Sequence, residues 1–297
     1  MYTLQKPFFM RVISPLHLGT GADIGIIDMP IQREKHTNFP KVESSSLKGA
    51  LRENFELNLK DQADLIKLTF GPEKGDTHAG AFSVTDATTL FFPVKSAKGI
   101  YALITCHEVL AKYNEHCGIL NAAEPPFDNK ELGSLKDLNE AKCIPFNLDA
   151  LAINNNKNVI LEEYAFEVEQ KTAGSIQKHF SFLDTDKMLI VSNETFRDFV
   201  TLSTEVITRN KIDNKTGTVA RGALFSEEYL PPETILFSLL QNGPINVKDK
   251  GSIPEDLEND KKVQEFLINN FPEVFQLGGN ATIGKGIVKV LWGGKNE

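Results

Sequence analysis

The segment that decides the fold begins at His17 and reads HLGTGADIGIIDMPIQREKHTNFPKVESSSLKGALR as far as Arg52. Residues 16–43 carry Gly and Pro without a helix or strand period, which predicts a long functional loop. Serines at 44–46 then offer an N-cap, and Leu47, Leu51 and Phe55 recur at i, i+4 and i+8. This pattern predicts a helix that begins near residues 44–46 and buries that face.

Short apolar runs on either side of this segment predict strands. The predicted strands are 8–13, 80–86, 88–94, 99–106, 159–169, 188–192, 233–241 and 286–292, with further helices at 107–116, 193–201 (capped by Asn193) and 257–270. Residues 204–225 are predicted to form two strands around the turn Asp213-Asn214-Lys215-Thr216-Gly217. Residues 120–156, with Pro125-Pro126 and three Asn at 154–156, are expected to be a loop-rich insertion.

These elements indicate an α+β fold in a single domain, residues 1–297, with insertions. Strand, helix, strand, strand, helix, strand is the ferredoxin-like order. RNA-recognition modules use the same sheet, although the usual aromatic strand motifs are not evident here. We therefore expect a ferredoxin-like palm that carries inserted finger and β-hairpin thumb elements.

The composition sets limits on location and partners. The chain has 297 residues and a net charge of −8. Without a long apolar run or a signal-peptide pattern, we expect a cytoplasmic protein with no membrane partner. Three Cys without a CxxC pair favour reduced thiols over structural zinc. The negative charge argues against a free nucleic-acid binder, but residues 31–52 form a locally basic stretch, in which Arg33 and Lys35 are predicted to bind RNA.

Four side chains are candidates for chemistry, each with a plain alternative. Asp28 stands among apolar residues before Pro30, and is either a turn residue or a carboxylate presented to a ligand. His17 is either packed at a strand end or available for proton transfer. Glu227 and Tyr229, two residues apart, would share one face of a strand, and otherwise belong to a solvated turn before Pro231-Pro232.

Phosphate contacts are predicted at the start of the serine-led helix. Hydroxyls of Ser45 and Ser46, the helix N-terminal amides and the cations Lys48 and Arg52 suit phosphate oxygens, unless they form a solvated face. The glycines at 19–25 have one residue too many for a dinucleotide fingerprint. Gly284-Lys285 lacks the Ser or Thr that a P-loop requires.

The order of these motifs is similar to that of a known family. Together with 80–86 (GAFSVTD), 227–234 (EEYLPPET) and 278–286 (GGNATIGKG), it resembles the backbone subunits, subunit four, of the type III-B CRISPR Cmr effector complexes, which are RAMP superfamily proteins. The resemblance implies that Asp28 enables target-RNA cleavage, with His17, Glu227 and Tyr229 near the scissile site, although Glu228 could be the relevant acid instead. It also implies that the loop with Gly279 and Lys285 lies beside the guide backbone.

The function expected from this resemblance is RNA-guided endoribonuclease activity. Several copies would stack along one CRISPR RNA in a filament with other Cmr subunits, and would cut complementary target RNA at regular intervals. Asp28 would hold a divalent ion, magnesium or manganese, or would act as a general base. A non-catalytic RNA scaffold, a nucleotide-dependent small-molecule enzyme and a guide-precursor nuclease are the alternatives. Residues 204–225 and 120–156 are the candidates for thumb and finger.

Overall fold

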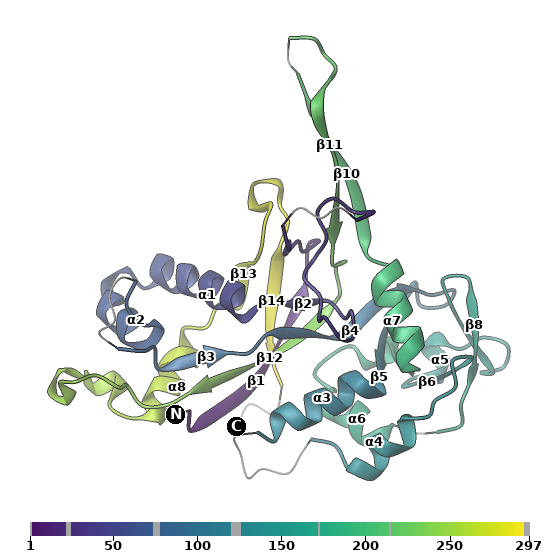
Figure 1. Cartoon of the computed structure of the whole chain (residues 1–297). Helices are drawn as coiled ribbons and strands as arrows, with labels where there is room; N and C mark the ends of the chain where they lie inside the picture. The colour runs from purple at the N-terminus through teal and green to yellow at the C-terminus, as the bar shows by residue number, and fades with distance from the viewer. Residues whose placement is uncertain are drawn as a thin grey trace.

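The computed structural model describes residues 2–21, 25–73, 78–119, 126–171, 173–213 and 215–293. In this part of the chain a mixed sheet of twelve strands forms the body (Figure 1). Its order is β13 (Val274–Gln276), β14 (Ile287–Trp292), β1 (Leu4–Val12), β12 (Ile235–Asn242), β4 (Ala87–Lys95), β5 (Tyr101–Cys106), β9 (Met188–Val191), β6 (Lys142–Pro145), β8 (Tyr164–Val168) and β7 (Asn158–Leu161), with β2 (Lys41–Val42) paired to β4 and β3 (Phe82–Val84) to β12.

Helices cover this sheet at several places. They are α1 (Ser44–Asn58), α2 (Ala63–Phe70), α3 (His107–Cys117), α4 (Asn129–Leu135), α5 (Leu148–Leu151), α6 (Gly174–His179), α7 (Asn193–Leu202) and α8 (Asp260–Asn269). The predicted apolar face of α1 is confirmed, because Leu47, Leu51 and Phe55 are its buried residues. In the described part of the chain, no helix is long and apolar enough to cross a membrane.

Strand β1 is apolar because both of its faces are covered. Successive side chains of a strand point to opposite sides. Phe8 packs against Phe271 with ring centroids 5.1 Å apart, while Phe9 packs against Tyr113 of α3 at 5.9 Å. The continuous apolar run that predicted this strand is therefore explained by burial on both faces.

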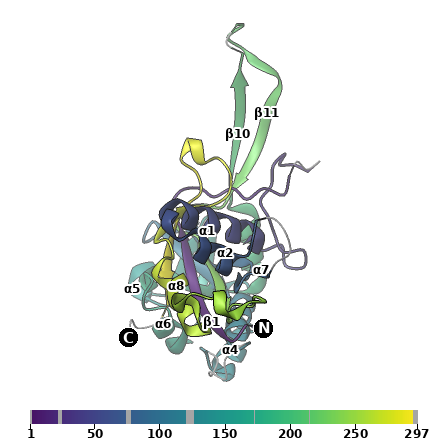
Figure 2. The same ribbon diagram turned by 90° about the vertical axis from the view of Figure 1, so that its left-hand side faces the viewer.

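The predicted hairpin is confirmed, and it is longer than expected. Strands β10 (Glu205–Ile212) and β11 (Val219–Tyr229) form a separate two-stranded sheet. Their pairing runs from Glu205 opposite Tyr229 to Ile212 opposite Val219. The hairpin projects far from the rest of the molecule in both views (Figures 1 and 2). Its base, where β11 ends, therefore lies at the boundary between the body and the projecting strands.

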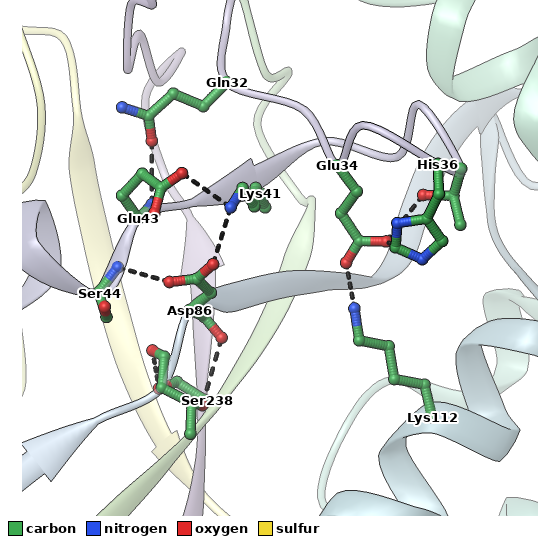
Figure 3. A network of polar contacts seen from close by, with 11 residues as sticks. Gln32, Glu34, His36, Lys41, Glu43, Ser44, Asp86, Lys112 and Ser238 are labelled. Carbon is green, nitrogen blue, oxygen red and sulfur yellow. Dashed lines mark hydrogen bonds and ion pairs between the residues drawn. The ribbon is translucent and has the colours of Figure 1, made fainter.

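Two predicted N-caps are wrong. The N-cap of α1 is Glu43, which makes no side-chain cap bond, and no serine serves instead. Asp86, which precedes β4, accepts a 2.9 Å hydrogen bond from the Ser44 amide and one of 2.8 Å from Lys41 (Figure 3). Burial opposes ionisation of Asp86, but these bonds outweigh it and lower its pKa. Likewise Ser192, rather than Asn193, caps α7 through its bond from Thr195 N.

The described part of the segment 120–156, predicted to be a loop-rich insertion, contains more regular structure than expected. Residues 126–156 contain α4, β6 and α5, and β6 pairs with β9 and β8 of the main sheet. Proline and asparagine suggested irregular structure, but they lie at the margins of these short elements. Asn154, Asn155 and Asn156 all have positive φ and form the turn before β7. Residues 120–125 lie outside the described part of the chain.

Candidate functional site

Three segments that are distant in sequence meet at the base of the hairpin. The loop after β1 joins the end of β11 through isolated bridges between Leu16 and Leu230 and between Met29 and Glu227. The C-terminal glycine loop joins the same place, since Gly279 N donates to His17 O at 2.9 Å. Figure 2 shows the C-terminal loop in yellow and the N-terminal loop in purple on either side of this base.

Asp28 is held by one residue of β11. Its Oδ2 accepts hydrogen bonds from Ser226 N at 2.7 Å and from Ser226 Oγ at 2.8 Å. These bonds, from the backbone first and the hydroxyl second, lower the pKa of the Asp28 carboxyl. The alternative of a local turn residue is wrong, because the partner is 198 residues away and Pro30 has no amide to donate. Asp28 is exposed and is therefore an anchored carboxylate that faces solvent.

Glu227 lies on the opposite side of β11 and is buried, with 3% of its surface exposed. Its Oε2 accepts from Tyr229 Oη at 2.6 Å and Arg209 at 2.7 Å, and its Oε1 accepts from Asn280 at 2.7 Å. Burial raises the pKa of Glu227, but the hydrogen bonds from Tyr229, Arg209 and Asn280 lower it by more. The side chain is therefore an ionised carboxylate enclosed by donors.

Tyr229 shares the face of Glu227, as the two-residue spacing predicted. It is buried, and Asn280 Nδ2 also donates to its hydroxyl oxygen at 3.1 Å. Desolvation, followed by the nearby Glu227 carboxylate, raises the pKa of Tyr229 to about 12. The ammonium of Lys285 lies over the Tyr229 ring, 5.0 Å from its centroid. Lys285 therefore stands at the edge of this cluster.

His17 is also buried, and its ring has a fixed orientation. Nδ1 lies 2.7 Å from the carbonyl oxygen of Glu228, which can only accept, so Nδ1 is the donor. Nε2 lies 3.4 Å from Glu227 Oε1. A Cβ at Gly19 would come within 2.7 Å of Nε2, and one at Gly278 would come within 2.3 Å of His17 O. The glycines of both loops therefore leave space for this histidine.

The residues predicted to bind RNA differ in how free they are. Ser45, Lys35 and Gly279 are exposed, and Ser46 is half-buried. Lys48 instead donates to Phe82 O at 2.9 Å, and burial lowers its pKa. Arg52 binds Glu56 at 2.7 Å and Gly71 O at 3.0 Å. The guanidinium of Arg33 is bound to Glu228 at 2.5 Å.

Sequence reasoning missed three residues of this site. Arg209 and Asn280 complete the shell of Glu227, and Arg209 also binds Asn280 Oδ1 at 2.9 Å. Ser226 anchors Asp28. The one local indication was the asparagine itself, which follows the glycines at 278 and 279. Its backbone is left-handed, with φ of 66°, a conformation in which asparagine is enriched. Nothing local marks Arg209 or Ser226, because their partners come from other segments.

The donor set for a metal ion is small. No group of three or more His, Cys, Asp and Glu side chains arranged to hold a metal ion occurs among the residues that the structure describes. At Asp28, Oδ2 is used by Ser226, and no hydrogen bond to Oδ1 is found within the same ranges. A metal ion at this site would therefore need further ligands from water or from a bound RNA.

Comparison with known proteins gives consistent matches. A family model described as RAMP superfamily matches residues 9–289. The CRISPR system Cmr endoribonuclease Cmr4 of Pyrococcus furiosus is 36% identical over 95% of this chain and 93% of its own length. The CRISPR system CMR subunit Cmr4 of Saccharolobus solfataricus is 27% identical, over 98% and 97%.

Solved structures match over nearly the whole chain. One is a chain of the type III-B Cmr-beta complex bound to cognate target RNA, with a TM-score of 0.78, 26% identity and coverage of 98% of both chains. Another is oligomeric Cmr4 from Pyrococcus furiosus, with a TM-score of 0.74, 28% identity and coverage of 98% of this chain and 99% of that one. The long loop, the hairpin and the C-terminal glycine loop all fall within these matched lengths.

Proposed function

This chain belongs to the RAMP superfamily and, within it, to the Cmr4 family, and we propose that it is an RNA-guided endoribonuclease. It acts as a backbone subunit of a type III-B CRISPR Cmr complex and cuts target RNA that is complementary to the CRISPR RNA. Base pairing supplies the sequence specificity, while the protein binds backbone and shape. Its partners are CRISPR RNA, target RNA, further copies of itself in a filament, and other Cmr subunits.

The observation that carries this proposal is the anchored carboxylate at the base of the hairpin. Asp28 is exposed, ionised and fixed by Ser226 at the point where β11 leaves the body. A hairpin that projects into an RNA duplex would bring the phosphates beside it close to this base. The 2′-hydroxyl of RNA can attack the adjacent phosphate, so the protein needs mainly to align the backbone and stabilise developing charge.

The pKa of Asp28 bears on its role. A general base works best when its pKa lies near the working pH. The bonds from Ser226 lower the pKa of Asp28 below its ordinary, already acidic value, so it accepts protons weakly at neutral pH. This favours a metal ligand, or a fixed negative charge, over a general base.

A divalent ion fits the residues present here. Magnesium keeps several waters and is commonly held by one or two carboxylates together with substrate phosphates. Asp28 would be its protein ligand, and RNA phosphates would supply others. When bound, magnesium or manganese would stabilise charge on the phosphate that is attacked. Asp28 contributes the orientation, since Ser226 fixes the direction of its carboxylate.

His17, Glu227 and Tyr229 support cleavage as positioning residues under this proposal. All three are buried, and Glu227 already accepts from Tyr229, Arg209 and Asn280. Direct contact with RNA would require these bonds to break. Their cluster instead joins the glycine loop to the hairpin base, so that the surface around Asp28 is fixed before RNA binds.

The sheet order supports a ferredoxin-like palm. Strands β14, β1, β12 and β4 are neighbours, and each pairs antiparallel with the next. Along the chain β1 is followed by α1 and β4, and β12 by α8 and β14. This is the split arrangement of a ferredoxin-like sheet. Strands β5, β9, β6, β8 and β7 extend the sheet beyond β4 as a finger, and the separate hairpin β10–β11 is the thumb.

RNA contacts are proposed along the two loops and the start of α1. Lys35, Ser45 and Gly279 are exposed, Ser46 is half-buried, and Lys285 lies at the edge of the Tyr229 cluster. Lys48, Arg52 and Arg33 were predicted to bind RNA as well, but each already binds protein groups. Their contribution to guide binding is accordingly proposed to be smaller. A cytoplasmic location completes the proposal, supported by three free cysteines.

The test is cleavage of complementary RNA by the guide-loaded complex in magnesium. We expect Asp28→Ala to preserve assembly and RNA binding and to slow cutting by at least about 1,000-fold, because the anchored charge is lost. Asp28→Asn, which keeps the shape, should be nearly as slow. Evenly spaced products that persist in both variants would leave this chain as a scaffold. Failure of the Asp28→Ala complex to assemble would make Asp28 structural.

A further inference from the structure

We propose that the ion pair between Arg33 and Glu228 is a clip that positions Asp28 at the hairpin base, and that Arg33 serves this purpose rather than RNA binding. The inference rests on the proposed function, because it concerns the same carboxylate. Asp28 and the loop that follows it are held in different ways. Asp28 is exposed and bonded to one residue, Ser226, whereas the loop just after it is fastened to β11 by buried groups.

The side chain of Glu228 extends the hydrogen bonding between the loop and β11 beyond their last backbone pair. Met29 N donates to Ser226 O, and Glu228 N donates to Met29 O, both at 3.0 Å. In such a parallel ladder the next donor of the loop is Ile31 N, but the carbonyl oxygen of Glu228 already accepts from His17 Nδ1. The Glu228 carboxylate takes over from there, and its Oε2 accepts from Ile31 N at 3.0 Å. The side chain therefore fixes the loop one step beyond the point where strand pairing ends.

Arg33 fastens the same carboxylate to the body. Its terminal nitrogens donate to Glu228 Oε1 at 2.5 Å, to Val200 O at 3.0 Å and to Asn38 O at 2.9 Å. Val200 lies in the last turn of α7, where carbonyl oxygens lack partners within the helix. A guanidinium meets these three acceptors with its planar, forked donors. Thr204, just before β10, donates to Glu228 Oε1 at 2.8 Å.

The clip thus joins four segments: the loop behind Asp28, the end of β11, the start of β10 and the end of α7. The side chains of Arg33 and Glu228 are only 15% and 3% exposed. Arg33 cannot reach an RNA phosphate without giving up its protein partners. Movement of the hairpin relative to α7 would instead pass through this pair to Asp28. Positioning errors of about 1 Å can reduce the rate of a reaction by about 100-fold.

The test uses isosteric changes, because removing one partner of a buried pair leaves an uncompensated charge. The main variant combines Arg33→Met with Glu228→Gln. Its matched control combines Lys112→Met with Glu34→Gln, which removes a partly buried pair made by the next residue of the same loop (Figure 3). Glu34 binds Lys112 of α3 and Thr37, and within the described ranges its side chain has no hydrogen bond or ion pair with the hairpin base. Arg33→Lys keeps the charge without the forked geometry.

Hydrogen exchange tests the clip independently of catalysis. In the assembled complex, the amides of Met29 and Ile31 should exchange at least about tenfold faster in the double variant than in wild type, and the control should leave them unchanged. Unchanged protection in the double variant would overturn the clip, whether or not the complex cuts RNA. Equal loss in the control would also overturn it, since general loosening of the loop would then be the cause.

RNA cleavage and guide binding test whether the Arg33–Glu228 pair positions Asp28 or Arg33 binds RNA. At saturating RNA, single-turnover cleavage should fall about 100-fold in the double variant and less than about threefold in the control. Guide affinity and its salt dependence should stay within about twofold, and Arg33→Lys should cut about as slowly as the double variant. An RNA-binding Arg33 would give the reverse: a salt slope lower by about 0.7, unchanged saturated rates and rescue by lysine. Wild type that cuts no better than Asp28→Ala would reject the proposed function, and the exchange result would still decide the clip.

Discussion

Glu227 shows how a single residue can stabilise the site by being charged. We expect Glu227→Gln to lower the free energy of unfolding by about 3 kcal/mol at pH 7, because a buried ionic partner of Arg209 is lost. The pKa of Glu227 is lower in the folded state than the ordinary value of 4.5 that it has in the unfolded chain. Its stabilising contribution is therefore complete above about pH 4.5 and is lost as the pH falls through the lower folded value.

Denaturant unfolding of both proteins between pH 7 and pH 3 measures this difference. The gap between wild type and Glu227→Gln should be constant near neutrality and should narrow in acid, since wild type becomes protonated there. Tyr229→Phe provides the comparison, because it removes one donor and keeps the carboxylate. A gap that does not depend on pH would show that the charge of Glu227 contributes nothing to stability.

The role of a single residue could be predicted from the sequence where the residues next to it in the chain indicate that role. Asp28 stood out as a carboxylate in an apolar run, and the spacing of Glu227 and Tyr229 correctly placed both on one face. Arg209 and Asn280 could not be predicted in the same way. Their contacts depend on where β10 and the C-terminal loop lie in space, 18 and 53 residues from Glu227.

The C-terminal glycine loop is the element that completes the site. Substitutions at two of its glycines distinguish the cost of backbone strain from the cost of steric crowding. Gly278 and Gly284 both have positive φ, at 77° and 74°. A Cβ at Gly278 would lie 2.3 Å from His17 O, whereas one at Gly284 would meet nothing within 4 Å. We expect Gly284→Ala to cost about 1 kcal/mol of stability and Gly278→Ala at least about 2 kcal/mol.

Unfolding and cleavage distinguish the two variants. Gly278→Ala should also slow cutting, because displacement of the loop takes Asn280 away from Glu227. Gly284→Ala should cut like wild type. Equal effects of the two substitutions on both measurements would mean that the close approach to His17 has no role in holding the loop.

Elements were predictable where their pattern was long or clearly bounded. Helix α1, strand β1 and the paired strands of the hairpin are of this kind, and all three are confirmed, while Asn214 of the predicted turn lies outside the described residues. Residues 126–156 were misread because α4, β6 and α5 are short, at seven, four and four residues. Their regular structure depends on the pairing of β6 with β9 and β8, which cannot be predicted from the local sequence. The α1 N-cap was misassigned for the same reason, since Asp86 comes from another segment.

The whole molecule is acidic, so the RNA contacts proposed for it are expected to be few and local. With a net charge of −8, the isolated chain should bind RNA weakly, because phosphate neutralisation dominates such affinity. Lys35 and Lys48 differ in a way that tests this. Lys35 is exposed, whereas the Lys48 ammonium donates to Phe82 O and lies 4.7 Å from the centre of the Phe82 ring. Only the exposed cation is free to displace counterions from RNA.

The salt dependence of guide-RNA affinity, measured on the assembled complex from about 50 to 200 mM salt, should therefore change when Lys35 is substituted and not when Lys48 is substituted. Lys35→Ala should reduce the slope of log affinity against log salt by about 0.7 for each copy in contact with the guide, without a change in stability. Lys48→Met should leave the slope unchanged and cost about 1–2 kcal/mol of stability, because the buried Phe82 carbonyl loses its donor. If Lys48→Met lowered the slope instead, its ammonium would have to leave Phe82 when RNA binds. The start of α1 would then rearrange around the guide rather than receive it in the form seen here.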